Sequence, residues 1–491
     1  MKKRIILLLL TASMLLPLLV GCKKEDEMEA DLVETEDATT FAVDEDTIGD
    51  YDFGGAEYTV LTRTETKYEY ASDKGLGGDV IERTVYKRNY EVEDRFNVKI
   101  KIVDKAGDWS KRDTFMTAVR AEQMGGGGGY DLVSTHNVYL GWMTIEGLAA
   151  DMSTLPEISF EKTWWNQNLY NEININGHVY FMLGDICTTT YEYIQVMFMN
   201  ETAFNNHFSS SDETVDVIYD LVANGEWTWD KLMTYAKAYG TTGQETVTDY
   251  GFAQNIHSWR ASFMSQDAYI YTRDTNGDLV LPDTPSDKFI DVVEKMVDFY
   301  KEENIRFYSE EWGTGANVLN PLFTQGDVLF YSQTLCEAKE FASSMRDTYG
   351  VIPLPKYDTF QEQYYTVCRD TVSAVMVMST TDNKEMSGVI TEALCMYGYK
   401  LVTPEYYETV LKVRYFDDPK YGAILDMIRA GLTHQVVECY VEDAPDFDRF
   451  LPLVVQSDKT KIVSTYTYYA TSGQSMLATF YSDLKSKGLY D

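Results

Sequence analysis

The sequence predicts an α/β protein with more than one hydrophobic core. In its first third, segments with strand-like alternation and segments with helical periodicity follow each other in turn, which indicates a mostly parallel sheet covered by helices. The chain has 491 residues, too many for one core, so we expect two lobes. Its composition, 44% hydrophobic and 14% aromatic, is that of a globular protein.

The elements of the first sheet are predicted from local patterns. The strand segments alternate apolar and polar residues, and Val85, Val92 and Phe96 fall along one side of the first helical segment. In order, the segments are strand 57–63, helix 79–96, strand 97–103, helix 109–124 and strand 130–133. The glycines Gly125–Gly129 precede a strand and lack the Lys-Ser/Thr pair of a phosphate loop, so we interpret them as a surface connector.

The rest of the chain continues with both kinds of element. We expect strands at 178–183, around Met197 and Phe198, at 328–332, 349–352 and 372–378, helices at 229–238 and 286–302, and mostly helix from Lys384 onward. Asn276-Gly277 predicts a hairpin turn between two short strands. Asp274 and Asp278 could begin a calcium loop, but the final acidic ligand of such a loop is missing. We therefore expect a turn there and no metal site.

The N-terminus has the features of a secretory signal peptide, residues 1–21. Three basic residues precede an apolar run, 5–20, that is short and interrupted for a membrane span. The run ends in Leu-Val-Gly-Cys22, which resembles the lipobox of bacterial lipoproteins and implies that Cys22 carries acyl chains such as palmitate. The alternative is an ordinary signal peptide with a chance cysteine. Residues 22–51 hold twelve acids and two lysines, which predicts a disordered acidic tether.

The net charge of −36 excludes partners that are themselves polyanions. Nucleic-acid phosphates and anionic lipid headgroups repel such a chain, so we expect no nucleic acid and membrane contact only through the lipid anchor. Five cysteines remain besides Cys22, and their spacing matches no zinc or CxxC pattern. Their apolar surroundings favour buried thiols, with a disulfide as the alternative. They are Cys187, Cys336, Cys368, Cys395 and Cys439.

Several stretches, taken in order, resemble a known family. They are Tyr130-Asp-Leu-Val133 with 134–137 and 147–151, Phe323-Thr-Gln-Gly-Asp-Val-Leu-Phe330, Tyr349-Gly-Val-Ile-Pro-Leu-Pro-Lys-Tyr357, Trp164-Trp165, 184–186, 225–230 and 402–407. Together they resemble extracellular solute-binding proteins of the carbohydrate-uptake type (family 1, maltose-binding-like), which serve ABC transporters. The likeness runs from about Asp52 to the C-terminus and is greatest to lipoproteins of Gram-positive bacteria.

The resemblance implies a periplasmic-binding-protein-like fold, two α/β lobes joined by crossing hinge segments. On that pattern lobe one comprises 52–185 and 327–370, and lobe two comprises 186–326 and 371–491. A carbohydrate, an oligosaccharide by this resemblance, binds between the lobes and passes to the permease subunits after the lobes close. The resemblance further implies a monomer without a cofactor on the extracytoplasmic face of the bacterial cell membrane.

Candidate ligand-binding residues lie mainly where predicted strands end, because open α/β sheets bind ligands outside the carboxyl ends of their strands. The resemblance places Thr135, His136 and Asn137 in a ligand loop of lobe one and Trp259 at a stacking position of lobe two. The other candidates are Arg63, Asp185, Tyr191, Arg260, Trp312 and Arg369. Sugars need planar polar groups for their hydroxyls and aromatic faces for their C–H surfaces, and the chain offers 37 Tyr and 8 Trp.

Structural roles compete for several of these residues. His136 could cap a helix, Asp185 could hold the hinge backbone, Trp259 could be a core residue, and Arg369 could form an interdomain ion pair.

We expect a binding protein and not an enzyme. The sequence contains no GxSxG, HExxH, Walker or nucleophilic Cys/His signature. Two alternatives stay open. One is a surface glycan-processing enzyme, because acids are plentiful and a glycosidase needs only two at a defined separation. The other is a protein of the same fold that acts as a sensor or binds a peptide.

Overall fold

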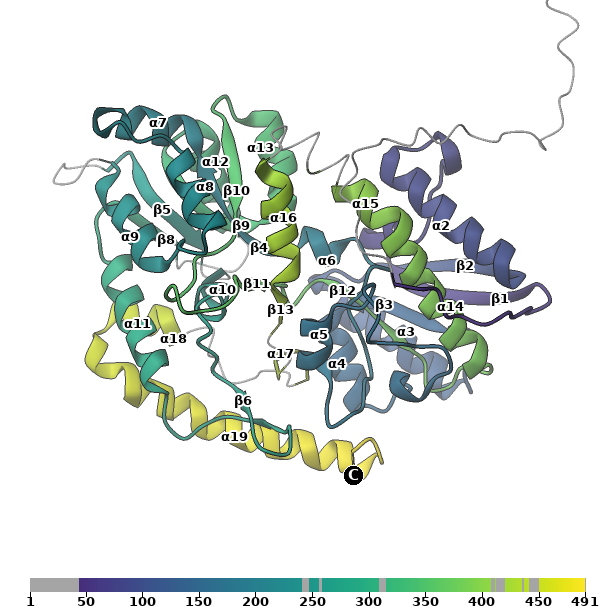
Figure 1. Ribbon diagram of the computed structural model, residues 1–491. Helices are drawn as coiled ribbons and strands as arrows, with labels where there is room; N and C mark the ends of the chain where they lie inside the picture. The colour runs from purple at the N-terminus through teal and green to yellow at the C-terminus, as the bar shows by residue number, and fades with distance from the viewer. Residues whose placement is uncertain are drawn as a thin grey trace, which may run out of the picture. The chain divides into compact units, whose positions relative to one another are not determined.

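A computed structural model describes residues 44–240, 247–255, 258–308, 315–407, 411, 420–434, 437–440 and 450–490 (Figure 1). The predicted lipidation site Cys22 and the candidate Trp312 lie outside these ranges. Helices and strands alternate along much of the chain, as the sequence predicts for an α/β protein.

The first sheet has the strand order β12-β3-β1-β2. Its strands are β1 Ala56–Arg63, β2 Val98–Lys105, β3 Leu132–His136 and β12 Ser373–Val377. β1 runs parallel to both β2 and β3, and β12 is antiparallel to β3. The predicted parallel arrangement of the first three strands is therefore confirmed, and the carboxyl ends of β1, β2 and β3 share one edge.

Helices cover this sheet as predicted. α2 Val80–Phe96 begins with a capping box, in which the Asp79 side chain accepts from the backbone of Ile81 and Glu82 while Glu82 accepts from the Asp79 backbone. Such a box satisfies the free N–H groups that open a helix. α2 lies beside α14 Lys384–Tyr397 (Figure 1), and α3 Arg112–Met124 follows β2.

The second sheet is mixed and has the order β10-β4-β9-β5-β8. β5 is parallel to β8 and β9, whereas β4 is antiparallel to β9 and β10. Its strands are β4 Gln195–Asn200, β5 Tyr250–Asn255, β8 Ile305–Tyr308, β9 Val328–Thr334 and β10 Tyr349–Ile352. The predicted hairpin is confirmed, because β6 Thr272–Arg273 pairs antiparallel with β7 Leu279–Val280.

The other described elements are further helices and one more pair of short strands. The helices are α4 Asn137–Ile145, α5 Gln167–Ile173, α6 Thr189–Glu192, α7 Glu201–Phe208, α8 Asp216–Ala223, α9 Trp229–Ala238, α10 Trp259–Met264, α11 Asp287–Tyr300, α12 Gly315–Gln325, α13 Ala338–Ser344, α15 Thr403–Glu405, α16 Lys420–Ala430, α17 Val437–Tyr440, α18 Phe450–Gln456 and α19 Ile462–Ser486. β11 Thr366–Val367 pairs with β13 Leu432–Thr433. Among the described helices, none combines the length and apolar character that crossing a bilayer requires.

Two of the later segments belong to other sheets than we expected. β9 and β10, within the segment 327–370 assigned to lobe one, pair with β4 in the second sheet. β12, within the segment 371–491 assigned to lobe two, pairs with β3 in the first sheet. Apolar strands predict burial but not the identity of their partners. The chain thus leaves the second sheet after β10 and enters the first sheet at β12.

Two further expectations are wrong in their details. Residues 178–183 form single bridges, His178 with Ile175 and Met182 with Val375, instead of a strand; the apolar run reflects burial and not extended pairing. Residues 44–51, expected as part of the disordered tether, are held on the surface. Asp46 pairs with Arg95 at 2.6 Å, and the side chain of Ile48 is buried, so a charge pair and an apolar anchor fix this segment.

Candidate functional site

A buried arginine ends β1 at the shared edge of the first sheet. Arg63 is 3% exposed, and its Nη1 lies 3.1 Å from Nε2 of His136 at the end of β3. Its Nη2 donates to Oγ of Ser373 on β12 at 3.3 Å. Three strands that are distant in sequence thus deliver polar side chains to one point.

The imidazole of His136 is neutral and acts as an acceptor toward Arg63. Its Nδ1 lies 2.7 Å from the carbonyl oxygen of Thr371, and a carbonyl can only accept, so Nδ1 carries the proton and Nε2 accepts from Arg63. Burial, and then the charge of Arg63, lower the pKa of His136 to about 3. The guanidinium of Arg63 therefore lies beside an uncharged ring.

A buried glutamate extends this arrangement. Oε1 of Glu69 accepts from the backbone N and from Oγ1 of Thr189, both at 2.9 Å. Oγ1 of Thr189 in turn accepts from the backbone N of Ser373 at 2.9 Å. Burial raises the pKa of Glu69. We refer to Arg63, Glu69, His136, Thr189 and Ser373 as the polar ring.

Side-chain polar atoms without a protein partner occur on the same segments of the described chain. They are Nε of Arg63, Oε2 of Glu69, Oε1 of Gln195 and the hydroxyls of Thr62, Thr66, Thr135, Thr188 and Thr190. A buried polar atom left unpaired costs about 1–3 kcal/mol, so native proteins supply it with water or a ligand. The concentration of such atoms here indicates a site for a molecule that both donates and accepts hydrogen bonds.

An aromatic cluster adjoins the polar ring. The ring of Tyr139 on α4 meets His136 edge to face at 4.8 Å, and it also lies 5.9 Å from Trp109 and 5.8 Å from Trp142. The guanidinium of Arg112 lies over both indoles, at 5.5 and 5.2 Å. Tyr139 and Trp142 are buried, but Trp109 is 55% exposed. The indole of Trp109 is therefore exposed to solvent on one side and contacts Tyr139 and Arg112.

Asn137 is engaged inside the protein. It is 0% exposed, its Nδ2 lies 3.3 Å from the carbonyl oxygen of Arg369 and 3.1 Å from Nε2 of His434, and its Oδ1 accepts from the Val138 backbone. These contacts tie the end of β3 to the segment before β12. They give Asn137 a positioning role next to the polar ring.

Asp185 is likewise occupied by protein donors. Its Oδ1 accepts from the hydroxyl of Tyr191, from Oγ1 of Thr403 at 2.5 Å and from Nη2 of Arg429 at 3.2 Å. These contacts engage Oδ1 inside the protein, and the two expected roles of Asp185, ligand contact and hinge support, stay predictions. Tyr191 is buried as well and meets Tyr407 edge to face at 5.3 Å.

The other candidates occupy different surroundings. Thr135 is buried on β3, and Trp259 is 1% exposed and packs edge to face on Phe263 at 5.1 Å. Arg260 is half-buried, and its charge adds to the burial that lowers the pKa of His434. Arg369 is half-buried, and its backbone N donates to the carbonyl oxygen of Tyr193 at 3.0 Å. The ligand-binding roles of these residues stay predictions.

Sequence reasoning did not select Glu69, Thr189, Ser373 or Trp109. A usable signal existed for Trp109, since it follows the end of β2, and the rule on strand ends already pointed to that edge. For Glu69 and Thr189 the signal was weak, because an acid in a short 3₁₀ turn and a run of threonines are common on protein surfaces. Ser373 was hidden by the unexpected pairing of β12 with β3.

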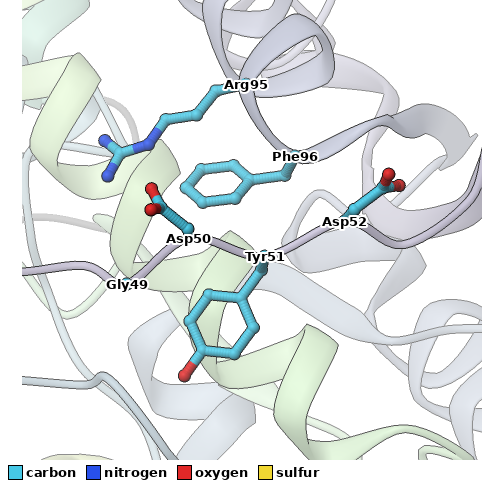
Figure 2. A pocket seen from close by; sticks show the side chains of 6 residues that line it. All are labelled: Gly49, Asp50, Tyr51, Asp52, Arg95 and Phe96. Atoms are coloured by element: carbon cyan, nitrogen blue, oxygen red, sulfur yellow. The ribbon is translucent and has the colours of Figure 1, made fainter.

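A surface pocket of about 190 Å³ lies elsewhere, between residues 49–52 and the end of α2 (Figure 2). It is smaller than the roughly 300–1,000 Å³ of typical small-molecule sites, and its Arg95 is paired with Asp46, so we do not place the ligand there.

Within the described ranges, no group of three or more His, Cys, Asp or Glu residues is arranged to hold a metal ion. The five cysteines there are free, as predicted, and four of them are buried, whereas Cys336 is half-buried.

Comparisons with known proteins agree on the fold. A model of the family described as bacterial extracellular solute-binding protein matches residues 90–391. A cyclo/maltodextrin-binding protein complexed with maltotetraose is similar at 14% identity, with a TM-score of 0.53 over 90% of this chain and 98% of the other. An extracellular solute-binding protein from Staphylococcus aureus in complex with maltose gives 13% identity and a TM-score of 0.55 over 88% and 98%.

A third structure extends the range of sugars. The galacto-N-biose/lacto-N-biose I-binding protein of an ABC transporter from Bifidobacterium longum, in complex with lacto-N-biose, gives 14% identity and a TM-score of 0.51 over 89% and 99%. At such identities the structures establish a common fold, and the predicted periplasmic-binding-protein-like architecture is confirmed. No curated protein sequence matches the chain.

Proposed function

Because the chain belongs to the family of bacterial extracellular solute-binding proteins, we propose that it captures a carbohydrate and delivers it to an ABC importer. The observation that carries the proposal is the exposed indole of Trp109 next to the buried polar ring. A sugar ring has an apolar C–H face and a rim of hydroxyls. The indole matches the face, and the unpaired polar atoms match the rim.

The chemistry of the polar ring favours a hydroxyl-rich ligand over an anion or a peptide. The atoms without partners include threonine hydroxyls, one arginine donor and one carboxylate acceptor, which together require a ligand with many groups that donate and accept at once. A simple anion would be attracted by Arg63 but would also lie near the carboxyl group of Glu69, which offers it no favourable charge. The sugar complexes named for the structural neighbours add support from the fold.

The rest of the predicted role follows from this proposal. The family places the protein outside the cytoplasm; we propose that acyl chains on Cys22 hold it there, that it acts as a monomer, and that lobe closure encloses the sugar before docking on the permease. Arg63, Thr135, His136, Tyr191, Trp259, Arg260, Trp312 and Arg369 remain proposed ligand contacts, whereas Asn137 and Asp185 are proposed to position them. The protein performs no chemistry on the sugar.

A ligand screen by thermal unfolding tests the proposal. The mature chain without the lipid is heated with maltose, maltotetraose, lacto-N-biose, other oligosaccharides and peptides. A ligand at a hundredfold excess over its Kd adds about 2.7 kcal/mol of stability, so a binding sugar gives a clear, saturable rise in Tm. Chromatography afterwards must recover that sugar intact. Consumption would indicate a glycan-processing enzyme, and a response to peptides alone would overturn the carbohydrate assignment.

A further inference from the structure

The buried face of α2 contains one charged residue. Val85, Arg88, Val92 and Phe96 are the buried residues of this helix, and their spacing of three and four residues is that of an apolar stripe. Arg88 is 1% exposed, and burial lowers the pKa of its guanidinium. A buried charge is costly for stability unless specific partners compensate it. An apolar side chain would complete the stripe without that cost, so the contacts that Arg88 makes define its role.

The guanidinium of Arg88 joins two turns that are distant in sequence. Its Nη2 donates to the carbonyl oxygen of Glu69 at 2.9 Å, and its Nη1 donates to the carbonyl oxygen of Ile186 at 3.0 Å. Nε and Nη2 also donate to Oδ1 of Asn89 at 3.1 and 3.0 Å, and Nδ2 of Asn89 donates to the carbonyl oxygen of Tyr70 at 2.7 Å. All three nitrogens of the guanidinium are thus engaged by protein oxygens.

Both turns carry atoms of the proposed ligand site. We refer to residues 64–70, the 3₁₀ helix with its final cap, as the Glu69 turn, and to residues 184–190 as the Ile186 turn. Together they hold four buried polar atoms without a protein partner, namely Oε2 of Glu69 and the hydroxyls of Thr66, Thr188 and Thr190. The last carbonyl groups of a helix have no partner within it, so the bonds from Arg88 and Asn89 close the end of the Glu69 turn. The bond from Arg88 to the Ile186 carbonyl then fixes this end to the Ile186 turn.

We propose that Arg88 is a positioning residue, which sets the affinity for the ligand by holding the Glu69 turn against the Ile186 turn without touching the ligand itself. The inference rests on the proposed function and adds to it a residue that acts through the backbone of the site. Groups that are fixed before binding lose less conformational freedom when the ligand arrives. The planar guanidinium of Arg88 donates to three oxygens in fixed directions, whereas the ammonium group of a lysine is a point charge. Lysine at this position should therefore leave the two turns less well fixed.

Calorimetric titration with maltose, maltotetraose, lacto-N-biose and any other saccharide that binds tests this role. At a temperature well below the Tm of every variant, Arg88→Lys should lower the affinity for each saccharide by about tenfold. The factor should be the same for all of them, because Arg88 contacts none. Asn89→Ala, which removes the bond to Tyr70, should lower it less, and it provides the test if the Arg88 variant does not fold. Val292→Ala is the control, because it removes buried volume from α11, outside both turns, and should change the affinity by less than about twofold.

Hydrogen exchange separates support of the two turns from support of the whole fold. In Arg88→Lys without ligand, backbone amides of the Glu69 turn and the Ile186 turn should exchange faster, while those of the second sheet keep the rates of the unmodified protein. In Val292→Ala the amides of both turns should keep their rates.

The outcomes distinguish the two proposals. If folded Arg88→Lys binds every saccharide as tightly as the unmodified protein, or if Val292→Ala loses as much affinity, Arg88 only supports the fold and the inference is overturned. If the loss is confined to one saccharide, Arg88 contacts the ligand and the inference again fails. If no saccharide binds the unmodified protein, the proposed function itself is wrong, whereas unchanged exchange of both turns in Arg88→Lys overturns the inference alone.

Discussion

The carboxylate of Asp185 and the guanidinium of Arg429 form a buried ion pair, with Oδ1 3.2 Å from Nη2. Arg429 lies near the end of α16, and the first turn of the same helix is fixed by Tyr421, whose hydroxyl donates to Glu201 at 2.8 Å at the end of β4. α16 therefore contacts two regions. One is the start of α7, next to the second sheet, and the other is the segment around Asp185.

Replacing Arg429 by Met should destabilise the protein by about 3–5 kcal/mol at pH 8, because it leaves a buried carboxylate without its counterion. The loss should be smaller at pH 5, since burial raises the pKa of Asp185 to about 6 and the lone carboxyl is then neutral. Urea unfolding at both pH values measures this. Lys459→Met, which breaks the exposed pair with Asp298, is the control and should cost less than about 1 kcal/mol. Equal losses at the two pH values would contradict the account.

The contribution of Glu392 to the stability of the protein should fall as the pH rises from 5 to 8. Glu392 accepts from the indole N–H groups of Trp164 and Trp165 at 2.7 and 2.8 Å, yet burial raises its pKa from 4.5 to about 7. A carboxyl whose pKa is higher in the folded state contributes stability that is complete below its unfolded pKa and is lost as the pH rises through its folded pKa. Chemical unfolding across this range gives the slope.

Glu392→Gln isolates this contribution. The amide keeps an acceptor for one indole but does not titrate, so the slope of the free energy of unfolding against pH should become shallower. Glu57→Gln, at the exposed start of β1 in a pair with Lys101, removes the same charge and should leave the slope unchanged. A Glu392 variant with the original slope would show that another group governs the pH dependence.

Trp109→Ala should lower the affinity for the most tightly bound saccharide by about tenfold, equivalent to about 1.4 kcal/mol. The reason is that the indole is the proposed stacking surface. Its side chain is 55% exposed, so the free energy of unfolding should change little. Phe360→Ala removes a ring that is 90% exposed on another surface loop and serves as the control. Calorimetric titration compares the three proteins, and unchanged affinity in the Trp109 variant would remove it from the site.

Arg95→Ala should release the segment 44–52 from the surface. Arg95 holds this segment through both carboxylate oxygens of Asp46 and through the carbonyl oxygen of Ile48. Limited proteolysis should then cut within the segment faster. Arg120→Ala breaks a comparable two-bond pair with Glu146 elsewhere and should leave the cleavage rate as it is. Faster cleavage in both variants would point to general loosening.

Local sequence patterns predicted the elements well and their partners less well. The alternation in 57–63 and 97–103 gave β1 and β2 to within two residues, since a half-buried strand shows its period directly. The same logic could not place β12 beside β3, because an all-buried strand carries no information about its neighbour. It also read 178–183 as a strand, although burial alone accounts for that apolar run.

For the candidate site as well, the sequence predicted some features and missed others. The rule on strand ends found Arg63 and His136, which meet as the two parallel strands bring them together. It could not separate side chains that face an unfilled position from those already engaged, such as Asn137. That distinction depends on partners contributed by segments hundreds of residues away, which only the folded chain reveals.

The most direct test of the account is a crystal structure of the protein with the saccharide that gives the strongest thermal shift. We predict a sugar ring stacked on the indole of Trp109, with sugar hydroxyls in hydrogen bonds to polar atoms that have no protein partner at the polar ring. A saccharide bound away from both Trp109 and the polar ring would contradict it.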